Sequence, residues 1–213
     1  MTDNVKAMSS CYDDLRSLHA LLGPAGARDV TLSAEARGQV VLAARRIVAA
    51  GDVDRQRARQ MAVAAERLAA ESRDDDPDAG WLARAQLRDL TGRELRERHL
   101  AQLDDVSCAA RLLLDATAGQ PERAAADLLT VSVSTLQRWA ADGRATPHPR
   151  ASCVARCVFH LRHGMTAAGV IAWWDHPRWE LGGRTPRAML DELPDSAPAL
   201  VALASGSREM VAA

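Results

Sequence analysis

The chain has 213 residues, of which 47% are apolar and 3% aromatic, and its formal net charge is −1 at pH 7. This length can bury the core of one large domain or two small ones, and no stretch approaches the ~20 apolar residues of a membrane span. Four widely spaced cysteines do not resemble a disulfide framework, so we expect a cytoplasmic protein without a membrane segment.

The composition predicts an all-α fold, because Ala, Leu, Arg, Glu and Gln favour helices and no long stretch alternates polar and apolar residues. At the N-terminus, residues 1–32 are expected to be irregular, since the sequence LLGPAGARD interrupts any helix. Ser33 is expected to cap a helix that ends at Gly51, and a second helix should follow at about residues 53–71.

An acidic linker at residues 72–80 should separate these helices from the next pair. Asp78 is a candidate cap for a short helix near Trp81, and the capping box TGRE at residues 91–94 should open a long helix to about Thr117. No chemistry is visible on these helical hairpins. We interpret residues 1–118 as a packing or dimerisation module of unknown role.

A compact pair of helices is predicted by the sequence AADLLTVSVSTLQRW at residues 125–139. Its spacing resembles the helix-turn-helix of bacterial regulators, with small Ala126 at the close approach of the helices and Thr130 where the turn usually begins with Gly. The apolar wedge would be formed by Ala125, Leu129, Val131, Leu136 and Trp139. Either Ser134, in a capping box with Gln137, or Ser132 would cap the second helix.

If the second helix is a recognition helix, its outward side chains meet the major groove. Gln can then read adenine and Arg can read guanine through paired hydrogen bonds. Residues 120–163 contain six basic and three acidic residues, an excess that suits a nucleic-acid partner. The candidate DNA-binding residues are Ser132, Ser134, Thr135, Gln137 and Arg138, with Arg144 and Arg150 as phosphate contacts.

The sequence CVARCVFHLRH places Cys153, Cys157 and His160 along one helix, with His163 one turn further on. Cys and His side chains bind zinc, but three ligands on one helix span about 10 Å at 1.5 Å per residue, which is too far for one ion. The neighbouring positions are apolar. We therefore predict buried thiols and no metal, with a zinc site or a redox sensor as alternatives.

The C-terminal third contains a Trp-containing helix, a glycine turn, and Thr185 followed by Pro186, which is a helix start. This region resembles the toxin-binding domain of the Xre/MbcA/ParS-type antitoxins over about residues 120–213. The matching residues are Trp173, Pro177, Leu181, Gly182, Gly183, Arg184, Thr185, Pro186 and Leu190. The resemblance implies central helices that bind operator DNA and a C-terminal domain that blocks a RES-type toxin, which consumes NAD.

Three parts are therefore expected: residues 1–118, a helix-turn-helix region at 119–163, and a small helical partner-binding domain at 164–213. The candidate partner-binding residues are Trp174, Trp179, Arg184, Arg187 and Arg208. The tryptophans could instead anchor the core. The arginines near the start of the Thr185 helix are poorly placed for its dipole, which favours an external carboxylate.

The leading hypothesis is an antitoxin that binds a RES-type toxin and represses its own operon as a homodimer or higher oligomer bound to double-stranded DNA. One alternative is a stand-alone or phage-type transcriptional regulator. Another is a structural helical adaptor that does not bind DNA. None of these is an enzyme, and we expect no cofactor.

Overall fold

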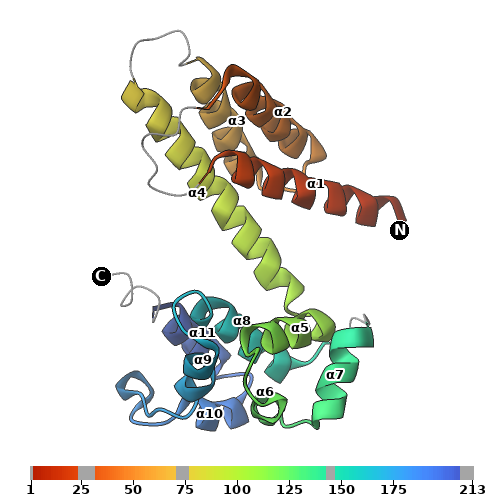
Figure 1. Cartoon of the computed structure of the whole chain (residues 1–213), viewed down its shortest axis with the longest axis vertical. Helices are drawn as coiled ribbons and strands as arrows, with labels where there is room; N and C mark the ends of the chain where they lie inside the picture. The colour runs from red at the N-terminus through yellow and green to blue at the C-terminus, as the bar shows by residue number, and fades with distance from the viewer. Residues whose placement is uncertain (1, 24–31, 71–76, 143–146, 207–213) are drawn as a thin grey trace. The chain divides into compact units, whose positions relative to one another are not determined.

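The computed structural model describes residues 2–23, 32–70, 77–142 and 147–206 (Figure 1). The fold is all-α, as the composition predicts, and extended pairing among these residues is limited to two isolated bridges. The chain forms two compact units, Met1–Arg98 and His99–Ala213, which we call unit 1 and unit 2. None of the helices in the described part of the chain has the length and apolar character needed to span a bilayer.

Unit 1 packs its helices around a core rich in alanine. It contains α1 (Thr2–Leu21), α2 (Ala34–Ala50), α3 (Arg55–Ala70) and most of α4 (Pro77–Gln102). Small side chains such as Ala43, Ala44 and Ala64 let the helix backbones approach closely, and Ile47 and Met61 fill the remaining space. This core is separate from that of unit 2, so unit 1 has its own source of stability.

The two helices predicted after Ser33 and at about residues 53–71 are confirmed as α2 and α3, but the expected irregular N-terminus is wrong. The Ser33 hydroxyl accepts a hydrogen bond from the Ala36 N–H at 3.1 Å, and Gly51 ends α2 in the left-handed region at φ 71°. Residues 2–21 form α1, however, because Leu15, Leu18 and Leu22 share one helical face that is fully buried. The helix-breaking sequence interrupts the chain only after this helix.

The predicted capping box at residues 91–94 does not start a helix. Thr91 lies inside α4 and donates its hydroxyl hydrogen bond to the Leu87 carbonyl at 2.9 Å, while the Glu94 carboxylate accepts one from Arg57 of α3 at 2.7 Å. The long predicted helix is instead broken near residue 104, where the Asp105 carboxylate caps α5 through the Ser107 N–H at 2.7 Å. A bond within α4 therefore occupies Thr91 and a tertiary contact occupies Glu94, so the two side chains do not form a box.

Unit 2 is built around α8, which is buried on most of its sides. The elements of this unit are α5 (Val106–Ala116), α6 (Glu122–Leu129), α7 (Val133–Asp142), α8 (Pro149–Leu161), α9 (Ala167–Trp173), η1 (Trp179–Leu181), α10 (Pro186–Met189), η2 (Leu190–Glu192) and α11 (Ala197–Gly206). Helices α5, α6 and α11 all pack on α8. Figure 1 shows α6 and α7 as two short helices joined by a tight turn.

The domain boundaries at residues 118 and 163 differ from the observed division. Leu112 and Leu113 of α5 lie in the same core as Leu128 of α6, so the region before residue 118 cannot be removed without opening that core. Trp173 and Leu200, from the predicted third part, are buried there too. A single core therefore unites residues 99–206, and the first boundary lies between Arg98 and His99.

Candidate nucleic-acid interface

The turn between α6 and α7 has a left-handed residue at its start. Thr130 has φ 57° and ψ 39°, a conformation that usually requires glycine because a Cβ is crowded there. The Val131 N–H then donates to the Ala126 carbonyl at 3.1 Å, which closes the end of α6. Thr130 thus adopts the geometry for which a helix-turn-helix normally uses glycine.

The predicted wedge between the two helices is present. Ala125, Ala126, Leu129 and Leu136 are at most 1% exposed, and the half-buried Val131 and Trp139 pack against the same core. Small side chains on α6 and large ones on α7 set the close approach of the helices. The spacing of apolar residues in this stretch therefore has the structural cause that the sequence predicts.

Ser132 caps α7, which decides between the two caps that the sequence allows. Its hydroxyl accepts a hydrogen bond from the Thr135 N–H at 3.1 Å. Gln137 does not complete a capping box with Ser134, because its amide donates to the Glu122 carboxylate at 2.7 Å. Glu122 begins α6, so this bond joins the first residue of one helix to an exposed side chain of the other.

The outward face of α7 is polar and accessible. Ser132, Ser134, Gln137 and Arg138 are exposed, and Thr135 is half-buried. Arg138 has no hydrogen bond or ion pair with another residue in the described ranges. Its guanidinium is therefore available to an external acceptor without loss of an internal contact.

Arg150 has a different position from the one expected of a phosphate contact. Its Nε donates to the Leu128 carbonyl at 2.8 Å, and one terminal nitrogen donates to the Leu190 carbonyl at 3.2 Å and to the Asp191 carboxylate at 3.0 Å. It is a structural cross-link between α6, α8 and η2. Arg144, the other expected phosphate contact, lies outside the described residues.

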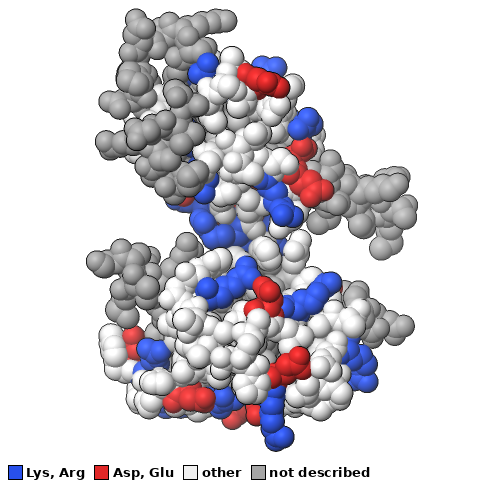
Figure 2. Space-filling view, in the orientation of Figure 1, with Lys and Arg blue, Asp and Glu red and all other residues white. Residues whose placement is uncertain are grey.

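On the face of unit 2 that Figure 2 shows, positive and negative side chains are interspersed and do not gather by sign. Arg156 pairs with Asp104, Arg162 with Asp115, and Arg123 weakly with Asp127. These pairs reduce the positive field that the excess of basic residues at 120–163 suggested. Any DNA contact by this unit therefore depends on the few side chains of α7 and less on a broad basic patch.

The C-terminal turn has the backbone geometry that its two glycines predict. Gly182 and Gly183 lie at φ 65° and 80°, and a bridge between Arg178 and Arg184 closes the loop around them. The Thr185 hydroxyl then accepts a hydrogen bond from the Ala188 N–H at 3.2 Å and caps α10. A side chain at either glycine would be strained whatever space surrounds it.

The tryptophans of this region divide into two groups. Trp173 and Trp174 pack edge to face with ring centroids 4.9 Å apart, and Trp174 is 0% exposed. The assignment of Trp174 as a partner contact is therefore wrong, because a partner could reach it only after the core opened. Trp179 is 85% exposed on η1, so it is the aromatic side chain that a partner can reach.

Internal carboxylates take the place of the external ones expected for two arginines. Arg184 forms two hydrogen bonds with Glu192, the shorter at 2.6 Å, and Arg187 pairs with Asp175 at 2.6 Å. These bonds lower the carboxyl pKa of Glu192 and of Asp175 below their ordinary values. The fifth candidate, Arg208, lies outside the described residues.

The two cysteines of α8 are buried, as their apolar surroundings predict. The hydrogen bond that Cys157 donates lowers the thiol pKa of Cys153, and the positive charge of Arg156 lowers it further. The same bond, together with burial, raises the thiol pKa of Cys157. Cys153 is therefore the more acidic thiol. In the part of the chain that the structure describes, no three His, Cys, Asp or Glu side chains come together as a metal site.

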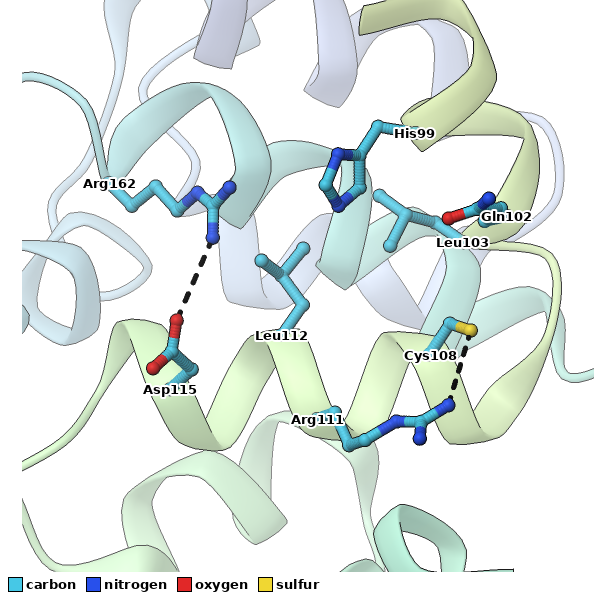
Figure 3. Close-up of a pocket in the computed structure, with 8 residues that line it drawn as sticks. All are labelled: His99, Gln102, Leu103, Cys108, Arg111, Leu112, Asp115 and Arg162. Atoms are coloured by element: carbon cyan, nitrogen blue, oxygen red, sulfur yellow. Dashed lines mark hydrogen bonds and ion pairs between the residues drawn. The ribbon is translucent and has the colours of Figure 1, made fainter. Parts of the chain in front are cut away.

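A cavity of about 350 Å³ lies beside α5 and includes two arginines (Figure 3). Arg162 turns toward Asp115, 3.8 Å away, while Arg111 turns toward the Cys108 sulfur at 3.5 Å, with Leu112 between them. The two guanidinium groups do not converge on one point. This cavity therefore offers no concentrated anion site.

Two residues of the interface were missed from the sequence. Glu122 meets Gln137 only because the helices fold back on each other. His148 caps α8 through its Nδ1 and packs on the Trp139 ring with centroids 4.9 Å apart. A capping residue before Pro149 is the same signal that identified Thr185, so this cap could have been found.

Comparisons of the chain with protein-family models, curated proteins and solved structures find no match.

Proposed function

We propose that unit 2 binds operator DNA through α7 and that the protein is an antitoxin that blocks a RES-type toxin and represses its own operon as a dimer. The observation that carries the DNA-binding proposal is the turn at Thr130, which has the left-handed geometry of a helix-turn-helix, together with the capped, polar α7 that follows it. A plain helical corner also has a buried wedge and a polar outer face, so the left-handed turn at Thr130 is the feature that favours a helix-turn-helix.

The side chains of α7 suit base recognition. Arg138 is exposed and has no internal acceptor among the described residues, so it can donate to guanine, and the exposed Gln137 can exchange its bond with Glu122 for one to adenine. Ser134 lies in the first turn of the same helix. Because most arginines of unit 2 are paired with carboxylates, the affinity should depend only weakly on salt.

The test measures binding of the full chain to its own upstream DNA at fixed salt. Arg138→Ala should weaken operator binding by about 5- to 150-fold, since a good base contact contributes ~1–3 kcal/mol, and should reduce discrimination against an altered site. Arg45→Ala is the matched control, because it removes an exposed charge from unit 1. Equal affinities of the wild type and Arg138→Ala for operator and altered DNA would refute the assignment.

The C-terminal turn supports the partner-binding part of the proposal. Trp179 is displayed on a loop that two left-handed glycines and the Arg178–Arg184 bridge hold in place. Buried aromatic anchors dominate many protein interfaces, and a preformed loop loses little entropy when it binds. An exposed tryptophan on such a loop is a suitable anchor for a toxin surface.

Co-expression with the RES-type toxin, followed by co-purification and growth measurement, tests this part. Trp179→Ala should weaken capture by roughly 30-fold or more, the range of an interface hot spot. Leu82→Ala, an exposed apolar residue of unit 1, is the control. Unchanged neutralisation by Trp179→Ala would show that the toxin binds elsewhere.

A stand-alone transcriptional regulator is the second candidate. Unit 1 is a separate compact body with its own core, and it lies entirely outside the region of resemblance at residues 120–213. Such a unit suits a sensing or oligomerising role. Operator binding by the full chain without capture of any RES-type toxin would favour this candidate.

A further inference from the structure

A second cavity of unit 2, of about 640 Å³, is unused by the proposed DNA and toxin contacts. One side of it is α8 and the other is α11, and the segment around Asp104 and Pro147 lines it as well. The bridge between Asp105 and Pro147 holds that segment in place. Cavities of roughly 300–1,000 Å³ accommodate compact organic ligands.

Most of the lining is apolar. It consists of Pro147, Pro149, Ala197, Pro198, Val201 and Ala202, together with the Cys153 thiol. Prolines and short side chains lose little conformational freedom when a ligand orders them. The surface is therefore preformed for an apolar body.

The polar groups of the cavity are largely satisfied by one another. Arg156 donates to both oxygens of Asp104 at 2.9 and 3.1 Å, and Ser152 donates to one of them at 2.6 Å. The hydrogen bond from Ser152 has the largest effect and those from Arg156 add to it, so the carboxyl pKa of Asp104 lies below its ordinary value. The ionised pair is neutral overall, so the cavity favours an uncharged ligand over a strongly charged one.

His148 supplies a hydrogen-bond donor at the edge of the cavity. Its Nδ1 accepts the Ala151 N–H at 3.1 Å, so in the neutral imidazole the proton lies on Nε2. The ring also packs on Trp139, which belongs to the wedge beneath α7. One side chain therefore lines the cavity, caps α8 and contacts the proposed recognition helix.

We infer that this cavity is an effector site for an uncharged, mainly apolar small molecule with one hydrogen-bond acceptor, and that its occupancy changes DNA binding by α7 through His148 and Trp139. The inference of a ligand site depends only on the cavity. The inference that ligand binding changes DNA affinity also rests on the proposed function. The two parts can be tested separately.

Nile red is a suitable probe, because it is uncharged, apolar and carries a carbonyl acceptor. Titration of the full chain should give saturable fluorescence at one dye per chain. Val201→Trp fills the cavity and should weaken binding at least tenfold, whereas Val63→Trp on an exposed site of unit 1 should not. Ala202→Phe, at an exposed position of the lining, gives a second test if Val201→Trp fails to fold.

Cys153 gives an independent readout of the same site. Bound dye should slow the reaction of its thiol with N-ethylmaleimide, in which a sulfur–carbon bond forms and the thiol proton passes to the adjacent ring carbon. The ligand site is overturned if the dye shows no saturable binding. This holds also if the dye is kept out because other chain segments or a second copy of the chain fill the cavity. So does undiminished binding by folded Val201→Trp or Ala202→Phe.

The coupling is tested with operator DNA and saturating dye. Occupancy should change operator affinity at least about fivefold. Trp139→Leu leaves every residue of the cavity lining in place but removes the ring that packs on His148, so this variant should bind dye without the change in DNA affinity. An unchanged affinity in the wild type overturns the coupling. Failure of the dye-free chain to bind operator overturns the coupling and the proposed function, while the dye titration still decides the ligand site.

Discussion

Replacement of Arg150 separates a structural role from a DNA contact. The side chain is 16% exposed and donates to the carbonyls of Leu128 and Leu190, both buried, as well as to Asp191. Arg150→Ala leaves these two carbonyls without their donor. A buried polar group that loses its partner costs ~1–3 kcal/mol, whereas the exposed Asp191 contributes little. We expect a loss of about 2–6 kcal/mol in the free energy of unfolding of unit 2, the sum for the two carbonyls.

Urea denaturation followed by tryptophan fluorescence measures this loss. Unit 2 contains Trp139, Trp173, Trp174 and Trp179, so the signal reports mainly on that unit. Arg138→Ala is the matched control, because this exposed residue should change stability by no more than ~0.5 kcal/mol. The two variants should therefore show opposite behaviour: Arg150→Ala loses stability, and Arg138→Ala loses operator affinity.

Arg150→Lys distinguishes charge from geometry. Lysine keeps the positive charge but cannot reproduce the planar fork that serves three acceptors on α6 and η2. If Arg150 is a cross-link, Arg150→Lys should recover little of the lost stability. If Arg150→Ala unfolds at the wild-type urea concentration while binding all DNA sequences more weakly, and Arg150→Lys restores that binding, the residue is a phosphate contact and the structural reasoning is refuted.

Three further predictions concern single residues. Thr130→Gly relieves left-handed strain of ~1–2 kcal/mol against an entropic cost of ~0.5–1 kcal/mol. Urea denaturation should therefore show a gain in stability of up to about 1.5 kcal/mol, and a clear loss would contradict the turn geometry. Burial, and to a lesser extent the charge of Arg88, lowers the His19 pKa below its ordinary 6.5. The folded state therefore binds fewer protons than the unfolded state, so the thermal unfolding temperature of unit 1 should fall as the pH drops below about 6.5. His19→Gln should abolish that pH dependence. N-ethylmaleimide should modify Cys153 faster than Cys157, because the Cys153 thiol is more acidic and lines a cavity. Peptide mass spectrometry measures the two rates, and equal rates would contradict this prediction.

Local chemistry accounts for the parts that the sequence predicts well. Ser33, Gly51 and Thr185 form caps or stops with their own neighbours, so these signals need no distant contact. The wedge of the helix-turn-helix is also local, because α6 and α7 lie within about twenty residues of each other. The positive φ of Gly182 follows from the same local reasoning.

Tertiary contacts decided what the sequence could not show. Thr91 and Glu94 look like a capping box, but long-range bonds to His19 and Arg57 and the continuous α4 override it. Arg150 and Trp174 carry chemistry suited to binding, yet Arg150 donates to carbonyls tens of residues away and Trp174 is buried in the core of unit 2. A sequence shows which groups a residue can offer, whereas only the folded chain shows which of those groups are already occupied.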